Sequence, residues 1–177
     1  MSVLGELTKL EKIFIGFNRV SDVSFLRSHT RNKIVELQIC GNPITDTSPL
    51  CSGLVFDNSR SVSVSAGRLG TVDLSFLGDI DVFDLIRLDG TDCTQLWRNV
   101  SGKQILWLVV DHSGLRDIRW LETVRSTWNF DISGNPGIRD LSALKKMESL
   151  QTVTVSKDMR PLTEAVAADV RFSFRFV

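Results

Sequence analysis

The sequence is poor in the residues that build disulfide scaffolds, metal sites and charged binding surfaces. Three cysteines occur among 177 residues, and no two of them are spaced as CxxC. That odd number argues against a disulfide framework and a zinc site, and predicts reduced thiols in a reducing, cytoplasmic compartment. Lys and Arg number 21, as do Asp and Glu, so the net charge is zero. Because nucleic-acid binders carry a basic surface, no nucleic-acid partner is predicted.

Long apolar runs are missing as well. No stretch approaches the ~18 consecutive apolar residues that a membrane span needs. The opening residues, MSVLGELTKLEK, lack the basic start and apolar core of a secretory leader. We therefore predict no membrane partner for this chain.

Catalytic signatures are also absent from the sequence. The two histidines, His29 and His112, stand outside any HExxH pattern, and no GxSxG, phosphate-loop or GxGxxG sequence occurs. We therefore predict a protein that is not an enzyme, with no catalytic residues, no metal and no cofactor. One alternative stays open, because a pocket that gathers His112, Asp111 and Asp131 would support an enzyme.

The sequence does contain one motif that recurs several times along the chain. In LEKIFIGFNRVSDVSFL and IVELQICGNPITDTSPL, the apolar residues and an Asn recur at an offset of 24 positions. The motif returns as NFDISGNPGIRDLSAL. Weaker copies lie between the second copy and this one, and they carry Gly, Thr or Ser at the Asn position. The first of these weaker copies, the third in chain order, is placed at Val62, Val64, Gly67 and Leu69. Copies about 22 to 25 residues apart are typical of a solenoid.

Each copy is predicted to form one coil around a short strand. A lone strand cannot hide its apolar face, so neighbouring copies are expected to stack in parallel. At the turn, the Asn, Thr and Ser side chains are expected to satisfy inward-pointing backbone groups in a hydrogen-bonded ladder. The segments SFL, SPL, SFL, QLW, RWL and SAL would form turns or short 3₁₀ pieces on the far side, where RSHTRNK and LCSGLVFDNSRS would bulge outward. Carboxylates that recur with the repeat are expected to cap these turns: Asp22, Asp46, Asp117 and Asp140.

The LxxLxLxxN pattern resembles the leucine-rich-repeat family, and the NxIxDxSxL tail resembles its internalin-type class of about 22 residues. The resemblance covers residues ~7 to 158. It implies an α/β solenoid: a right-handed horseshoe with a parallel β-sheet on the concave face and turns or short 3₁₀ segments on the convex face. We expect a single domain over residues 1–177, with about seven repeats over 10–158.

The two ends of the chain differ from the repeats. Residues 1–12 are predicted to be an N-terminal cap or the tail of a preceding repeat, because a terminal coil needs a cover. Residues 159–177 are predicted to form a C-terminal helix, from PLTEAVAADV, and then an edge strand, from the alternating VRFSFRFV.

Alternate strand residues define a candidate binding surface on the concave face. In the third copy the outward residues are predicted to be Ser61, Ser63 and Ser65. Elsewhere four apolar residues and four charged ones are predicted to face outward, and aromatic and Arg anchors with a polar rim are typical of protein-binding patches. The tryptophans Trp97, Trp120 and Trp128 are predicted to lie in the core instead. The predicted partner-binding residues are Phe14, Gln38, Leu85, Arg87, Asp89, Trp107, Val109, Asp111 and Asp131.

The sequence therefore predicts a non-enzymatic module that presents a concave sheet face to a protein partner. Two alternatives remain at this point. The Phe-rich C-terminal strand and the open first coil also suit a structural segment or scaffold subunit of a larger complex. The size of the chain also suits a small toxin-neutralising, immunity-type partner protein.

Overall fold

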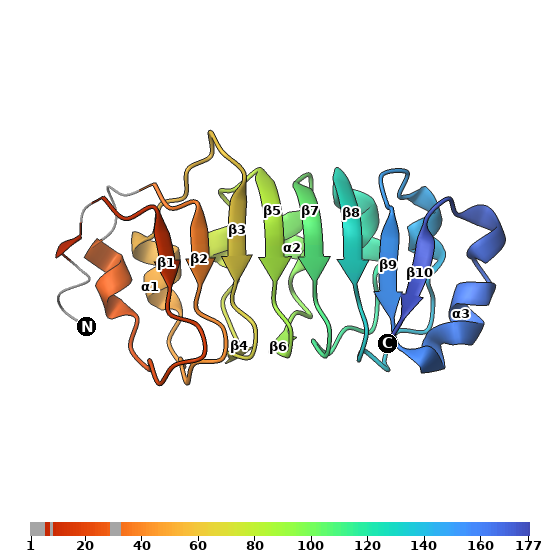
Figure 1. Ribbon diagram of the computed structural model, residues 1–177, viewed down its shortest axis with the longest axis horizontal. Helices are drawn as coiled ribbons and strands as arrows, with labels where there is room; N and C mark the ends of the chain where they lie inside the picture. The colour runs from red at the N-terminus through yellow and green to blue at the C-terminus, as the bar shows by residue number, and fades with distance from the viewer. Residues whose placement is uncertain (1–5, 8, 29–32) are drawn as a thin grey trace.

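The fold is a solenoid whose strands form one open parallel sheet (Figure 1). The computed structural model describes residues 6–7, 9–28 and 33–177. Eight strands stand side by side in chain order, from β1 at one end to β10 at the other. They are β1 (Lys12–Phe14), β2 (Glu36–Gln38), β3 (Val62–Ser65), β5 (Val82–Arg87), β7 (Gln104–Val109), β8 (Ser126–Asp131), β9 (Thr152–Val155) and β10 (Ser173–Phe176).

Short helical pieces return the chain behind the sheet (Figure 1). All six predicted far-side segments contain such a piece, mostly of 3₁₀ type. Two short strands, β4 (Gly70–Thr71) and β6 (Thr91–Asp92), pair separately below the main sheet. The helical pieces are η2 (Ser24–Ser28), α1 (Ser48–Gly53), η3 (Ser75–Leu77), α2 (Trp97–Val100), η4 (Arg119–Thr123), η5 (Ser142–Lys146), η6 (Lys157–Met159), α3 (Arg160–Glu164) and η7 (Ala167–Asp169).

The core consists of inward-facing rows that run across the strands, as the repeat predicted. Strand pairing places Leu37 beside Val64, Ile86 and Leu108 in successive coils. These side chains are almost completely buried, since each is covered by the coils on both sides. A second row follows the backbone hydrogen bonds just beyond the strands and contains Ile15, Ile39, Ala66, Leu88, Val110, Ile132 and Val155.

The third strand is displaced by two residues from its predicted register. Leu37 pairs with Val64 and not with Val62, so the paired outward residues begin at Ser63 rather than at Ser61. Both valines are fully buried, because an alternation of period two fits either register. The long connection that leads into β3 sets the register instead, and Figure 1 shows it rising above the strand ends.

A ladder of polar side chains holds the turns together, as predicted. The Asn135 amide donates to the carbonyl oxygens of Val110 and Ile132 at 2.9 Å each, and its oxygen accepts from the amides of Ser113 and Leu115 at 3.0 Å. Each such side chain therefore joins its own coil to the preceding one. Equivalent bonds come from Asn42, Thr91 and Ser113.

Aspartates cap the far-side pieces at regular intervals. The Asp140 carboxylate accepts hydrogen bonds from the Ser142 amide at 2.8 Å and from the Ser142 hydroxyl at 2.7 Å. Because these bonds favour the charged form, they lower the pKa of Asp140. The same amide bond, two residues on, is made by Asp22, Asp46, Asp73, Asp92 and Asp117.

The ends of the chain are covered differently. Half of the predicted N-terminal cap, residues 1–5 and 8, lies outside the described residues, as does the middle of the predicted RSHTRNK bulge. At the other end β10 pairs with β9 alone, and Phe172, Phe174 and Phe176 are half-buried against the core. The Arg160 guanidinium lies 4.4 Å above the Phe176 ring.

Removing one rung of the ladder should weaken the fold strongly. We expect Asn135→Ala to lower the free energy of unfolding by about 2–4 kcal/mol, because it leaves buried carbonyl and amide groups unpaired. The matched variant is Asn18→Ala, whose exposed amide bonds only within the first coil, to Ile15 and Gly16. It should cost less than about 1 kcal/mol. Urea unfolding followed by tryptophan fluorescence measures both, and equal losses would contradict the ladder.

Two fully buried threonines should respond oppositely to the same substitution. The Thr127 hydroxyl has no hydrogen-bond partner among the described residues, whereas the Thr91 hydroxyl donates to the Ala66 carbonyl at 3.1 Å. Thr127→Val should therefore raise the free energy of unfolding by about 1 kcal/mol, and Thr91→Val should lower it by about 1–3 kcal/mol. Chemical denaturation measures the two signs, and a destabilising Thr127→Val would refute the assignment.

Acid should remove the stabilisation supplied by the capping aspartates. Hydrogen bonds from Ser48 and Ser142 lower the pKa values of Asp46 and Asp140, so the folded state holds fewer protons than the unfolded chain. This stabilisation is complete above the unfolded pKa, about 4, and is lost as pH falls through the lowered values. We expect the urea midpoint of Asp46→Asn/Asp140→Asn to fall less between pH 5 and pH 2 than that of the native chain. If the urea midpoints of the variant and the native chain fell equally with pH, these caps would contribute nothing to the acid sensitivity.

Candidate functional site

The outward face of the sheet is organised in rows, because the strands pair in register. One row crosses the middle of the strands and contains Lys12, Glu36, Ser63, Leu85, Trp107, Asn129, Thr152 and Ser173. The next row contains Phe14, Gln38, Ser65, Arg87, Val109, Asp131, Thr154 and Arg175. Seven of the nine predicted binding residues fall in these two rows, so the structure brings most of them onto one face.

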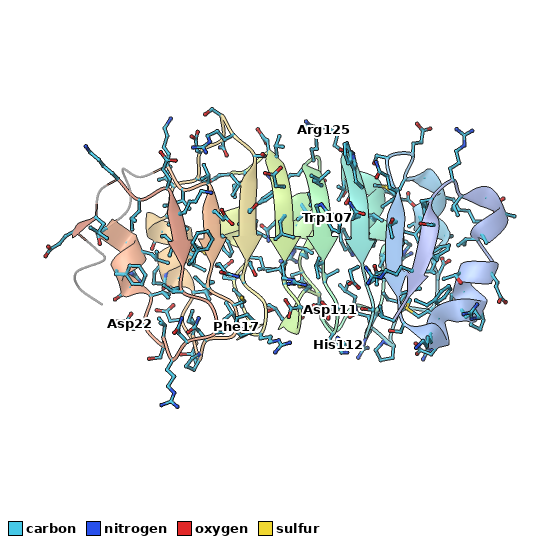
Figure 2. All side chains as sticks on the ribbon, viewed as in Figure 1. Phe17, Asp22, Trp107, Asp111, His112 and Arg125 are labelled. Carbon is cyan, nitrogen blue, oxygen red and sulfur yellow. The ribbon has the colours of Figure 1, made fainter. Side chains whose placement is uncertain are left out.

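A hollow of about 410 Å³ lies over β5 to β10 on this face. Trp107 stands in it with 50% of its surface exposed, near the middle of the sheet in Figure 2. The small polar residues of β8 and β9 form its far side, which leaves the indole standing above its neighbours. Five of the predicted residues line the hollow: Leu85, Arg87, Trp107, Val109 and Asp131.

A smaller hollow of about 140 Å³ continues the surface toward the first coil. Phe14 and Gln38 line one side of it, and Leu85 and Arg87 line the other. Between them β3 contributes only serines, whose short side chains lower the surface along this strand. Leu85 and Arg87 therefore form part of a ridge with a hollow on either side.

The other two predicted residues, Asp89 and Asp111, lie at the carboxyl ends of the strands and line neither hollow. Asp89 lies 3.3 Å from the Arg68 guanidinium and 3.6 Å from that of Arg87. Asp111 lies 3.0 Å from the His112 imidazole. Arg87 and Asp89, two of the four predicted charged residues, are therefore paired within the molecule, and Figure 2 places Asp111 and His112 at the lower rim.

Val109 was predicted to be an exposed apolar residue, and that prediction is wrong. It is only 9% exposed, although its position faces outward. Its partners across the sheet are Arg87 and Asp131, and a short branched side chain between two longer ones is shielded from water. Trp107 and Leu85 thus supply most of the accessible apolar surface of this hollow.

The prediction that three tryptophans lie in the core is correct only in part. Trp120 is half-buried, and its ring meets that of Phe130 edge-on at a centroid distance of 6.2 Å. Trp97 and Trp128 are 45% and 44% exposed. In β8 the buried residues Thr127 and Phe130 are three apart, so two successive residues between them face outward and Trp128 is one of these. The LxxL part of the repeat carried this signal, which strict alternation overlooks.

A second exposed row, missed by the sequence analysis, runs along the turns. Phe17, Arg68 and His112 adopt left-handed backbone conformations with φ of 54°, 58° and 52°. In the following coil the equivalent residue is a glycine with positive φ each time: Gly41, Gly90 or Gly134. A Cβ atom on Gly134 would lie 2.5 Å from the His112 ring, and one on Gly41 would lie 2.7 Å from that of Phe17. The large side chains thus lie flat over the glycines.

The geometry does not support the enzymatic alternative. Asp131 lines the sheet hollow without Asp111 or His112, so the three residues do not meet in that hollow. Within the described part of the chain, no group of His, Cys, Asp and Glu could hold a metal ion. Burial raises the pKa of the Cys93 thiol to about 12, which keeps it protonated at neutral pH.

No helix of the described residues is long and apolar enough to cross a membrane.

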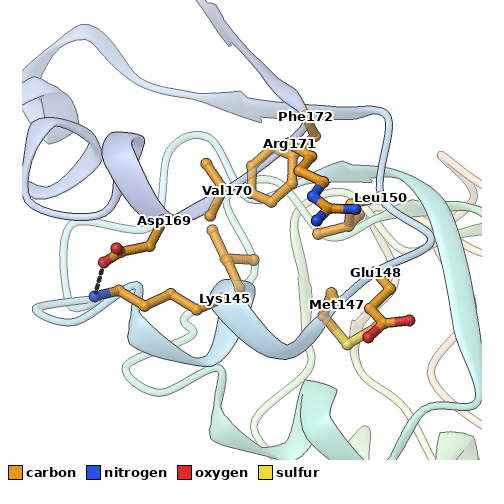
Figure 3. Close-up of a pocket in the computed structure, with 9 residues that line it drawn as sticks. Lys145, Met147, Glu148, Leu150, Asp169, Val170, Arg171 and Phe172 are labelled. Atoms are coloured by element: carbon orange, nitrogen blue, oxygen red, sulfur yellow. Dashed lines mark hydrogen bonds and ion pairs between the residues drawn. The ribbon is translucent and has the colours of Figure 1, made fainter.

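A further hollow of about 430 Å³ lies at the C-terminal end of the solenoid (Figure 3). It opens between the segment after η5 and the segment that leads into β10. The Lys145 ammonium and the Asp169 carboxylate form an ion pair at 2.5 Å across one side of it. Because this pair and Leu150 tie the last coil to the preceding one, the hollow belongs to the structural end of the array.

Comparison with known proteins bears on the fold alone. No family model matches the chain, and no curated protein matches it. The structure is similar to the crystal structure of an internalin from Listeria monocytogenes, with a TM-score of 0.53 and 18% sequence identity. The match covers 86% of this chain and 48% of the internalin chain, so this chain spans about half the length of that protein. The repeat, the parallel sheet and this similarity together show that the chain has a leucine-rich-repeat fold.

Proposed function

We propose that the chain is a non-enzymatic protein-interaction module that binds a protein partner through the outward face of its sheet. The observation that carries the proposal is Trp107, half exposed beside Arg87 in the larger hollow. Trp and Arg are the residues most enriched at the energetic centres of protein interfaces. The polar residues around them would form the rim that excludes water.

The rigidity of the scaffold favours this function. The strands that carry Leu85, Arg87 and Trp107 are paired on both sides, and the ladder fixes the turns beneath them. A surface that is already ordered loses little conformational entropy when a partner binds. Hence a modest contact area suffices for useful affinity.

A repeat class and a compartment are part of the same proposal. We assign the coils to the internalin-type class, which the offset of 22 between Leu85, Trp107 and Asn129 supports. We also propose a reducing, cytoplasmic compartment, which the free thiols of Cys40, Cys51 and Cys93 support.

A structural role in a larger assembly is the second candidate. The half-buried aromatic residues Phe172, Phe174 and Phe176 at the last strand favour it, because further protein packed there would bury them fully. Phe174→Ser tests this role. The variant and the native chain are each passed in cell extract through a size-exclusion column, and their elution is compared. A shift of the native chain alone to a larger complex would support it, and identical elution of both would refute it.

The sheet face is tested by truncating its two anchors. Proteins that co-purify with the native chain are identified and titrated with the native chain, with Trp107→Ala and with Arg87→Ala. Each variant should bind at least about tenfold more weakly than the native chain. Phe17→Ala is the matched control, because Phe17 is also exposed but lies in a turn and lines neither hollow of the sheet face. Far-ultraviolet circular dichroism establishes that all three fold. Undiminished affinity in both sheet variants would overturn the proposal.

A further inference from the structure

The largest of the hollows described here lies on the helical side of the solenoid, away from the sheet face. It has a volume of about 630 Å³ and opens between α2 and the segment that leads into η4. We call it the tryptophan cleft, because the indoles of Trp97 and Trp120 both line it. The residues that line it are Thr94, Trp97, Leu115, Arg116, Asp117, Arg119 and Trp120.

One wall of the tryptophan cleft is held rigidly. The Trp120 indole nitrogen donates to the Asp117 carbonyl at 3.0 Å, and the Trp120 ring rests edge-on against buried Phe130. At the base of the cleft, the Leu115 amide donates to the Asn135 side chain at 3.0 Å. The apolar wall is therefore fixed before any ligand arrives, which lowers the entropic cost of binding.

The only carboxylate that lines the tryptophan cleft is already engaged. One oxygen of Asp117 accepts from the Arg119 side chain at 2.6 Å, and the other accepts from the Arg119 amide at 2.8 Å. Arg116 forms no ion pair with any described residue, and neither does Arg98, whose guanidinium lies 5.3 Å from the Trp97 ring. The residues that line the cleft therefore carry one net positive charge, that of Arg116, while Asp140 and Glu122 lie near Arg119 outside the cleft.

The position of Arg116 is set by the next coil. Gly137 is the residue by which the sixth repeat is longer, and a Cβ atom there would lie 2.9 Å from the Arg116 side chain. Because glycine leaves this space open, the stem of Arg116 can lie across the neighbouring coil at the mouth of the cleft. A flexible surface cation is thereby placed beside an apolar wall.

We propose that the tryptophan cleft binds a segment of a partner protein in which an apolar side chain is flanked by carboxylates. The two indoles would contact the apolar side chain, and the unpaired guanidinium of Arg116 would pair with an adjacent carboxylate. Trp and Arg in one cleft, with local positive charge in a chain of zero net charge, favour an acidic peptide over a neutral one. This site is separate from the sheet face and stands whether or not that face binds a partner.

The test uses the full chain and a fluorescein-labelled peptide of twelve residues, in which Phe and Leu are separated by Glu and Asp. Fluorescence anisotropy should show saturable binding that weakens at least tenfold in Trp97→Ala and in Arg116→Glu. Phe17→Ala and Arg125→Glu are the matched controls and should bind as the native chain does, because neither residue lines the tryptophan cleft (Figure 2). Peptides with Lys in place of the acidic residues, or Ser in place of Phe and Leu, should not bind.

Several outcomes would overturn the proposal. No saturable binding at 1 mM acidic peptide is one, and equal binding of the Lys peptide is another. Unchanged affinity in both Trp97→Ala and Arg116→Glu would place the peptide elsewhere. The rival occupant is an anionic membrane, so vesicles of phosphatidylserine and phosphatidylcholine provide the last arm. Vesicle binding that requires Trp97, without peptide binding, would assign the cleft to lipid.

Discussion

The whole structure depends on how the turns after the strands satisfy their backbone groups. At this edge the chain leaves the sheet, and carbonyl and amide groups point into the interior, where water cannot reach them. Asn42, Ser113 and Asn135 fill that space and bond both to their own coil and to the preceding one, and Thr91 bonds to the preceding coil. Burial of the apolar rows drives the coils to stack, and these polar contacts fix the rotation of each coil relative to the preceding coil. The fixed rotation gives the sheet face a defined shape.

The repeat carried enough information to predict the fold, since burial and turning impose the same residue types on every coil. The inward row of Leu37, Ile86 and Leu108 follows the repeat, because apolar spacing and turn residue agree in these copies. The third copy was misplaced by two residues, because Val62 and Val64 suit either register and Leu69 replaces the Asn that would have marked the turn. Register there depends on the length of the preceding connection, which the local pattern does not encode.

The candidate sheet surface was largely predictable, and the tryptophan cleft was not. Outward strand residues follow from alternation, so Arg87 and Trp107 could be placed on neighbouring strands of one face once the coils were aligned. Trp97 and Trp120 belong to far-side segments, which carry no period that separates inside from outside. Their exposure depends on how successive coils are offset, and the position of Arg116 beside them depends on the single residue Gly137. Such features are visible only when the coils are stacked.

Large side chains and glycines alternate at the turn position of successive coils, and this alternation groups the coils into pairs. Phe17, Arg68 and His112 each lean onto the glycine of the next rung, so a rung is complementary to its successor but not to itself. Deleting one rung would bring two overhanging side chains, or two unroofed glycines, into contact. Growth or shortening of this array by duplication is therefore compatible with the rim only in steps of two coils. In this part of the molecule the packing of the turns therefore repeats every two coils.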